Sequence, residues 1–116
     1  MAILGITFKE DVPDLRNTKV VDIINELKDY GVNVLVSDPL ADPDEAQSYY
    51  DVQLLPLEKL KNLDAAILAV MHKEYCEIGL AGITGMCADN NALMIDVKGC
   101  FDPAEAKKLG VTYWRL

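Results

Sequence analysis

Lysine residues follow three apolar segments of this chain that have the composition of buried strands. Lys9 comes directly after the first segment, Lys73 follows residues 65–70, and Lys98 follows residues 92–97. Ammonium groups that converge where water is partly excluded offset the charge of a phosphate or diphosphate. Because the chain has only 11 Lys and Arg against 19 Asp and Glu, the recurrence predicts an anionic ligand. The alternative interpretation is that each lysine is an ordinary solvated loop residue.

Strands and helices are predicted to alternate along the chain. Strands are predicted over six apolar segments: 2–8, 32–39, 52–57, 65–70, 92–97 and 111–116. Helical patterns fall between them, over 17–31, 42–51, 57–64, 73–90 (partly) and 102–110. Asn17 or Thr18 can cap the first helix and Gly31 can close it. The alternation predicts one three-layer α/β/α domain over residues 1–116, a Rossmann-like, doubly wound fold with a mostly parallel sheet of about six strands.

The carboxyl ends of the strands are the expected ligand-binding edge, at the point where strand order reverses. A dinucleotide bound there needs a glycine-rich turn after the first strand, but residues 5–19 contain only Gly5. Asp38 stands where such folds place a ribose-binding acid. Without the glycine cradle, Asp38 with Pro39 is predicted to form a turn instead. The glycines at 79, 82 and 85 follow no strand and indicate a loose connection.

Composition excludes several classes of partner. The formal net charge of −8 argues against nucleic acid, whose binding needs an excess of Lys and Arg. No apolar stretch approaches the ~20 residues of a membrane span, so no membrane partner is expected. Three cysteines without CxxC spacing do not indicate a disulfide framework, and a reducing cytoplasm is the expected compartment.

Metal and nucleophile chemistry have weak support in the sequence. His72 with Cys76, Cys87 and Cys100 does not have the spacing of a compact zinc site. No cysteine has a predicted partner base, and His72 is interpreted as a hydrogen-bonded loop residue. We therefore expect no metal site and no catalytic residue in this domain.

The opening stretch resembles a family signature. Gly5-Ile6-Thr7-Phe8-Lys9, followed by Asp14, Arg16 and Thr18, is similar to the G-x-x-F-K-x-x-x-x-D-x-R-x-S/T pattern of nucleotide-sugar 6-dehydrogenases, the UDP-glucose/GDP-mannose dehydrogenase family. The segments "SDPLADPDEA", "ILAVMHKEY" and "MIDVKGCFD" resemble later segments of the same family. The resemblance covers essentially the whole chain and looks closest to the branch that oxidises UDP-N-acetylhexosamines.

The resemblance implies that residues 1–116 are the C-terminal, nucleotide-sugar-binding domain cut from a longer enzyme. Such enzymes oxidise the C6 alcohol of a UDP-sugar to a carboxylate, forming uronic acids for polysaccharide biosynthesis. NAD is held mainly by an N-terminal domain, a central helix mediates assembly into homodimers or larger oligomers, and the catalytic cysteine precedes this domain. The isolated 116-residue domain is therefore expected to be inactive.

The resemblance also assigns roles to four residues. Phe8, Lys9 and Lys98 would contact the nucleotide sugar, and Arg16 would reach the NAD bound by the other domain. Several members have an arginine at or beside the position of Lys98, so a bidentate guanidinium contact is not expected here.

Two other hypotheses remain open. The chain is a stand-alone regulatory module that binds an anionic nucleotide without catalysis, or it is a Rossmann-like domain that retains no ligand site. An upstream reading frame with a glycine-rich turn and a cysteine motif separates the enzyme from the module. A negative titration with UDP favours the last hypothesis.

Overall fold

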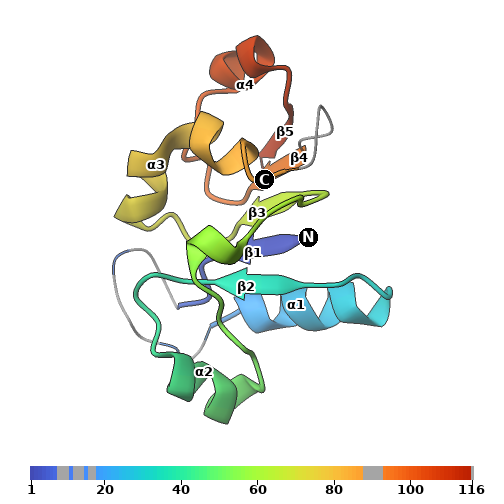
Figure 1. Ribbon diagram of the computed structural model, residues 1–116, viewed down its shortest axis with the longest axis vertical. Coiled ribbons are helices and arrows are strands. Elements are labelled where there is room, and N and C mark those ends of the chain that lie inside the picture. Colours follow the sequence, from blue (N-terminus) through green and yellow to red (C-terminus); the bar gives the residue numbers. More distant parts are fainter. Residues whose placement is uncertain (8–10, 12–14, 16–17, 88–92, 116) are drawn as a thin grey trace.

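A parallel β-sheet forms the centre of the molecule. The computed structural model describes residues 1–7, 11, 15, 18–87 and 93–115. Its strands are β1 (Ala2–Leu4), β2 (Leu35–Ser37), β3 (Ala66–Leu68), β4 (Leu93–Asp96) and β5 (Thr112–Arg115). They pair in parallel in the order β2-β1-β3-β4-β5 (Figure 1). The predicted Rossmann-like α/β fold is confirmed.

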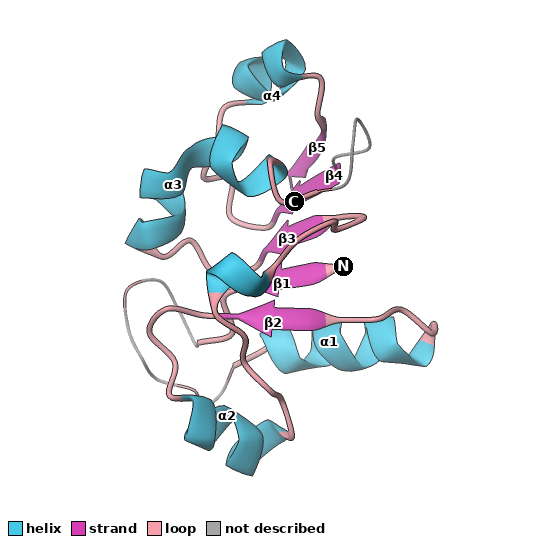
Figure 2. Ribbon diagram, viewed as in Figure 1, coloured by secondary structure: helices cyan, strands magenta, loops and turns pink. Residues whose placement is uncertain are grey.

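Helices connect the strands and lie on both sides of the sheet (Figure 2). They are α1 (Val20–Asp29), α2 (Pro43–Tyr50), α3 (Lys73–Thr84) and α4 (Pro103–Leu109), with one 3-10 turn at Leu57–Lys59. Helix α3 is interrupted at Gly79, whose φ of 80° and ψ of 167° are not helical. The predicted disturbance of this helix by its glycines is therefore confirmed.

The predictions for residues 52–64 were wrong. Residues 52–57 do not form a sixth strand: Leu54 makes one isolated parallel bridge with Val36, and the ladder does not continue. Pro56 follows directly and has no N–H to donate to a ladder. The helix predicted over 57–64 is only the short 3-10 turn.

Short polar side chains and glycines set the helix ends. Thr18 Oγ1 accepts a hydrogen bond from the N–H of Val20 at 3.2 Å, at the start of α1. Gly31, with φ 79°, closes the same helix. Asp42 and Asp102 cap α2 and α4, each followed by a proline in the first turn. The second predicted cap of α1, Asn17, lies outside the described residues.

Two apolar cores lie on opposite faces of the sheet. One includes Ile3 and Ile67 of the strands with Val20 and Ile24 of α1. The other joins alternate strand residues to α3 and α4: Ala2, Leu4, Ala66, Leu68, Met94, Tyr75, Leu80, Ile83 and Ala106. Because side chains alternate across each strand, both faces of the central strands are buried, as parallel sheets require.

Strand order reverses between β1 and β3. The chain leaves β1, returns through α1 to β2 on one side, and then crosses to β3 on the other side of β1. The carboxyl ends of β1, β2 and β3 therefore meet at one edge, which is the expected ligand position in an open parallel sheet. We call this region, formed by Gly5–Thr7, Asp38 and residues 69–72, the switch-point edge.

Candidate functional site

Asp38 is the central acceptor of the switch-point edge. Its Oδ2 accepts hydrogen bonds from the N–H groups of Ile6 (2.7 Å) and Thr7 (3.1 Å) after β1. Its Oδ1 accepts from the N–H groups of Leu40 (2.8 Å) and Ala41 (3.1 Å), which forms the turn after β2. The predicted turn at Asp38 is therefore confirmed, and the same carboxylate also holds the exit of β1.

The pKa of Asp38 reflects two opposed effects. Burial by itself raises the pKa of this carboxyl group, but the hydrogen bonds from His72, Ile6 and Leu40 outweigh it. The pKa consequently lies below its ordinary value of 3.8. Asp38 is therefore ionised at neutral pH, and its charge is shared among fixed donors.

His72 completes this hydrogen-bonded group from the end of β3. Its Nδ1 accepts the backbone N–H of Asp11 at 2.9 Å, so the ring proton of the neutral imidazole lies on Nε2. Nε2 faces Asp38 Oδ2 at 3.0 Å and Thr7 Oγ1 at 2.9 Å. With both ring nitrogens engaged and the residue fully buried, His72 holds neighbouring segments together, as its interpretation as a hydrogen-bonded loop residue predicted.

Asp11 joins the loop after β1 to helix α3. It has a left-handed φ of 62°, and its Oδ1 accepts the N–H of Lys73, the first residue of α3, at 2.8 Å. The backbone N–H of the same residue is bonded to His72. Two adjacent positions of the β3–α3 connection are thus bound by one loop residue, which orients the loop at the edge.

Further along the same loop, Leu15 is a second anchor. Its side chain is 1% exposed, within the core on the α1 side of the sheet. Its carbonyl oxygen accepts a hydrogen bond from the Tyr50 hydroxyl of α2 at 2.5 Å. The loop between β1 and α1 is therefore fixed at Thr7, Asp11, Leu15 and Thr18, on both sides of Phe8, Lys9 and Arg16.

Gly5 brings β1 close to the end of β3. Its φ is +93°, and a Cβ atom there would lie 2.6 Å from Val70 Cβ. The N–H of Gly5 donates to the carbonyl of Ser37 at 2.8 Å, and the Tyr75 hydroxyl donates to the same carbonyl at 2.9 Å. A glycine is required by this approach between strand ends and does not form a phosphate cradle.

A second carboxylate, Asp96, organises the loop that carries Lys98. It is fully buried at the end of β4, where Oδ1 accepts the N–H of Gly99 and Oδ2 that of Phe101, both at 2.9 Å. The Tyr113 hydroxyl donates to Asp96 Oδ2 at 2.5 Å. Burial first, and then this contact with Asp96, raises the pKa of Tyr113. Residues 97–101 are thereby held at the carboxyl edge of the sheet.

The predicted site residues have different positions in the structure. Lys98 is exposed on this second loop. Phe8, Lys9 and Arg16 lie outside the described residues, so their roles stay predictions. Lys73, the third strand-end lysine, lies on the surface of α3 with Nζ 3.8 Å from Glu77 Oε1. The anchoring network of Asp38, His72, Asp11 and Asp96 was missed, although an acid after β2 and a histidine after β3 were visible in the sequence.

Two of the cysteines, Cys87 and Cys100, are not activated nucleophiles. Burial, followed by the neighbouring thiol of Cys76, raises the pKa of Cys100 to about 12. Burial also raises the pKa of Cys87. Thiols of raised pKa are protonated at neutral pH and are poor nucleophiles. Among the described residues, no three His, Cys, Asp or Glu side chains are grouped to hold a metal ion.

The described residues do not fit a bound NAD. A dinucleotide fold uses the acid after β2 to hold a ribose, but Asp38 already accepts four backbone N–H groups and contacts His72. Val70 fills the space beside the backbone of Gly5. Neither residue is available to a dinucleotide.

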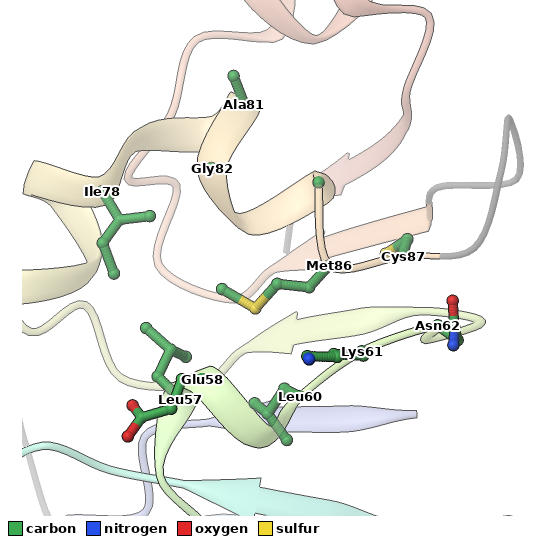
Figure 3. A pocket seen from close by; sticks show the side chains of 11 residues that line it. Leu57, Glu58, Leu60, Lys61, Asn62, Ile78, Ala81, Gly82, Met86 and Cys87 are labelled. Atoms are coloured by element: carbon green, nitrogen blue, oxygen red, sulfur yellow. The ribbon is translucent and has the colours of Figure 1, made fainter.

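A groove lies between residues 57–62 and the C-terminal half of α3 with the residues that follow it (Figure 3). Its volume is about 730 Å³, and its lining comes from residues 57–62 and from Ile78 to Cys87. Most of the lining side chains are apolar or small, with Glu58 and Lys61 of opposite charge. It shares no residue with the switch-point edge and has no convergent cations for a diphosphate.

In the described part of the chain, no helix combines the length and the apolar character needed to cross a membrane.

Comparison with known proteins gives a consistent result. Residues 2–103 match the model of the UDP-glucose/GDP-mannose dehydrogenase family, UDP binding domain. Protein CapL of Staphylococcus aureus is 41% identical over 114 residues, which are 98% of this chain and 26% of CapL. UDP-N-acetyl-D-glucosamine 6-dehydrogenase of Pseudomonas aeruginosa is 42% identical over 81 residues, 70% of this chain and 19% of that protein.

A solved structure agrees with these relatives. The NDP-N-acetyl-D-galactosaminuronic acid dehydrogenase from Methanosarcina mazei Go1 superimposes with a TM-score of 0.85 at 26% sequence identity. The match covers 97% of this chain and 23% of that one. The chain thus spans about a quarter of the length of the relatives it matches.

Proposed function

The chain belongs to the UDP-glucose/GDP-mannose dehydrogenase family as its UDP-binding domain, and from this premise we propose its role in catalysis. It is the C-terminal domain of a longer NAD-dependent UDP-sugar 6-dehydrogenase of the cytoplasm, which forms uronic acids for polysaccharide biosynthesis. The substrate is a UDP-N-acetylhexosamine, since the relatives of about 40% identity include a UDP-N-acetyl-D-glucosamine 6-dehydrogenase. The full-length enzyme is a homodimer or larger oligomer.

One observation carries the proposal: the loop between β1 and α1 is tied to the switch-point edge on both sides of the signature residues. Phe8 and Lys9 stand in sequence between Thr7 and Asp11, which are bonded to Asp38 and His72 respectively. In an open parallel sheet this edge is where ligands bind. A lysine there neutralises a diphosphate, and a phenylalanine contributes apolar contact.

Lys98 is the second cation of the proposed site. Its loop is held by the buried carboxylate of Asp96 at the same carboxyl edge of the sheet. Lysine binds phosphate as a mobile point charge, in contrast to the bidentate geometry of arginine. We therefore assign Lys98 to charge neutralisation of the diphosphate and not to recognition of the sugar.

Arg16 has a different proposed partner. The described residues do not fit NAD, so the cofactor is proposed to bind to the part of the polypeptide outside residues 1–116. NAD supplies the hydride acceptor there, and Arg16 is proposed to contact it. The domain itself positions the nucleotide sugar by charge and shape, a contribution that lowers the barrier by orientation.

The test compares the full-length protein with the 116-residue chain. NADH formation is measured with NAD and each of UDP-GlcNAc, UDP-GalNAc, UDP-ManNAc, UDP-glucose and GDP-mannose. We expect the full-length protein to oxidise a UDP-N-acetylhexosamine preferentially, and the 116-residue chain to form no NADH. In a parallel NMR titration, the 116-residue chain should bind UDP weakly, with shifts at Gly5–Thr7 and residues 97–101.

Lysine variants sharpen the test. In the full-length enzyme, Lys9→Ala should raise the KM for the UDP-sugar at least about tenfold, the equivalent of one lost charge-assisted contact. Lys59→Ala, on the exposed 3-10 turn, is the matched control and should leave the KM unchanged. Turnover by the isolated domain, or an unaltered KM for Lys9→Ala, contradicts the proposal. UDP binding without dehydrogenase activity in the full-length protein favours the regulatory module instead.

A further inference from the structure

Two free thiols, those of Cys76 and Cys100, are neighbours at the carboxyl edge of the sheet. They come from the connections that follow two adjacent strands, since β3 and β4 pair in parallel with Leu68 opposite Asp96. Cys76 lies in the first turn of α3, and Cys100 lies in the loop between β4 and α4. The parallel pairing therefore brings together two cysteines that are far apart in the sequence and belong to no site described above.

The two thiols have different surroundings. Cys76 is exposed, whereas Cys100 is half-buried against the apolar core on the α3 and α4 side of the sheet. The Cys100 thiol is hydrogen-bonded with the Cys76 thiol, and this contact raises the pKa of Cys100 after the larger effect of burial. One thiol is thus open to a reagent from solvent, and the other lies next to it, partly shielded by the core.

The backbone is fixed on both sides of this contact. The N–H groups of Gly99 and Phe101, which flank Cys100, donate to the buried carboxylate of Asp96 at 2.9 Å. The N–H of Cys76 donates to the carbonyl oxygen of the residue that precedes α3, at 3.3 Å. The two side chains therefore stay in contact without any rearrangement of the fold.

We propose that Cys76 and Cys100 form a reversible disulfide that ties α3 to the loop carrying Lys98. The oxidant is a small-molecule disulfide of the glutathione class. Disulfides that form in a reducing compartment are usually transient and regulatory. The pairing of the thiols does not depend on the proposed function; only a consequence for binding of the UDP-sugar through Lys98 does.

The disulfide forms through two thiol–disulfide exchanges. The exposed Cys76, as its thiolate, attacks one sulfur of the small disulfide; the S–S bond of that molecule breaks, and a small thiolate leaves and takes up a proton. The Cys100 thiol then loses its proton to solvent and attacks Cys76 Sγ, which releases the second small thiol. Two protein thiols are oxidised to one disulfide, and the small disulfide is reduced to two thiols.

The half-buried thiol takes the second step because its partner is adjacent. The raised pKa of Cys100 makes it a poor nucleophile toward reagents in solution. A neighbouring group, however, reacts as if it were present at a high effective concentration. A mixed disulfide at Cys76 also carries no charge, so the contribution of Cys76 to the raised pKa of Cys100 disappears in the intermediate.

The experiment treats the 116-residue chain with mixtures of reduced and oxidised glutathione, followed by acid quenching, alkylation and intact mass spectrometry. Once oxidised glutathione predominates, we expect most chains to keep a single alkylated thiol, that of Cys87. Cys76→Ser and Cys100→Ser should form no internal disulfide. Cys87→Ser is the matched control, because Cys87 is also half-buried but lies at the opposite, amino edge of the sheet, where it bridges to Leu63. This variant should form the disulfide as readily as the native chain.

Folding of the variants is measured independently. In reducing buffer, the thermal midpoint of each serine variant should lie within a few degrees of that of the native chain. Oxidation should raise the midpoint of the native chain by at least about 5 °C. It should also slow amide hydrogen exchange at Gly99 and Phe101, because a covalent bond restricts the loop that it joins to α3. Cys76→Ser should show neither change.

Two kinds of product overturn the proposal. One is a lasting glutathione adduct on the chain without an internal disulfide. The other is a disulfide that includes Cys87 or joins two chains as readily as it joins Cys76 to Cys100. None of these measurements uses UDP or NAD, so failure here is distinguishable from failure of the proposed function.

Discussion

His72 Nε2 lies 3.0 Å from Asp38 Oδ2, and neither side chain is exposed to solvent. The pair links the ends of β3 and β2 across the exit of β1, so it fixes three strand ends with one contact. The other ring nitrogen of His72 accepts the N–H of Asp11, which leaves no free nitrogen for proton transfer. The pair is therefore a structural support beneath the proposed nucleotide site.

Replacing Asp38 by asparagine should destabilise the domain strongly. Asp38→Asn removes the charge that accepts four backbone N–H groups, and an amide offers only one acceptor oxygen. We expect a loss of about 2–4 kcal/mol in urea unfolding of the 116-residue chain. Asp44→Asn, at an exposed position in the first turn of α2, is the control and should change stability by less than about 0.5 kcal/mol. A similar small effect at Asp38 contradicts the assigned role.

The domain should become less stable as the pH is lowered, because Asp38 becomes protonated. The pKa of Asp38 is lowered in the folded chain from an ordinary value of 3.8, so its contribution is complete above that value and is lost as the pH falls through the lower, folded pKa. The free energy of unfolding of the native chain minus that of Asp38→Asn should be constant above about pH 5 and shrink below about pH 4. A difference that grows toward acid pH would show the opposite sign of shift.

Gly5→Ala should be among the most damaging substitutions of a glycine. The added Cβ meets Val70 Cβ at 2.6 Å, and the φ of +93° is itself unfavourable for alanine. We expect a loss of about 2–4 kcal/mol. Gly110→Ala is the matched control, with φ +71° and no atom within 4 Å, and should cost about 1 kcal/mol from backbone strain alone. Chemical denaturation of the two variants separates the cost of the steric contact from the cost of backbone strain. Equal losses of stability would mean that Val70 moves aside and that the contact adds no cost.

Tyr113→Phe should loosen the loop that carries Lys98. The hydroxyl donates to Asp96, and it lies 3.0 Å from the carbonyl oxygen of Phe101. Its removal should cost about 1–2 kcal/mol and increase amide hydrogen exchange at Gly99 and Phe101. Tyr49→Phe, on the exposed surface of α2, should alter neither measurement. Unchanged exchange in Tyr113→Phe would indicate that Asp96 holds the loop without the tyrosine.

Lys98→Ala should weaken binding of the UDP-sugar to the full-length enzyme. A single exposed ammonium group near a diphosphate contributes about 1 kcal/mol, which corresponds to a KM about fivefold higher. Raising the salt concentration should reduce the difference between the native enzyme and the variant, because exposed charges are screened. Lys107→Ala on α4 controls for the general loss of one positive charge. Equal effects of the two variants would remove Lys98 from the proposed site.

Local patterns in the sequence were sufficient for much of the fold. The alternation of apolar strands and capped helices identified all five observed strands and the four α-helices. Asp42 and Asp102 marked helix starts because capping depends on residues two or three positions away. The sixth strand was wrong because Leu54 and Leu55 are apolar enough for a strand, whereas pairing beyond one bridge depends on neighbours that local composition does not describe.

The sequence by itself determined the α/β class, the family signature at residues 5–18 and the position of cations after strands, because these depend on residue type and short spacing. Only the tertiary structure decided what those residues contact. Asp38 and His72 are 34 positions apart, and Asp11 and Lys73 are 62 apart, so their pairing exists only once the parallel strands bring their ends to one edge.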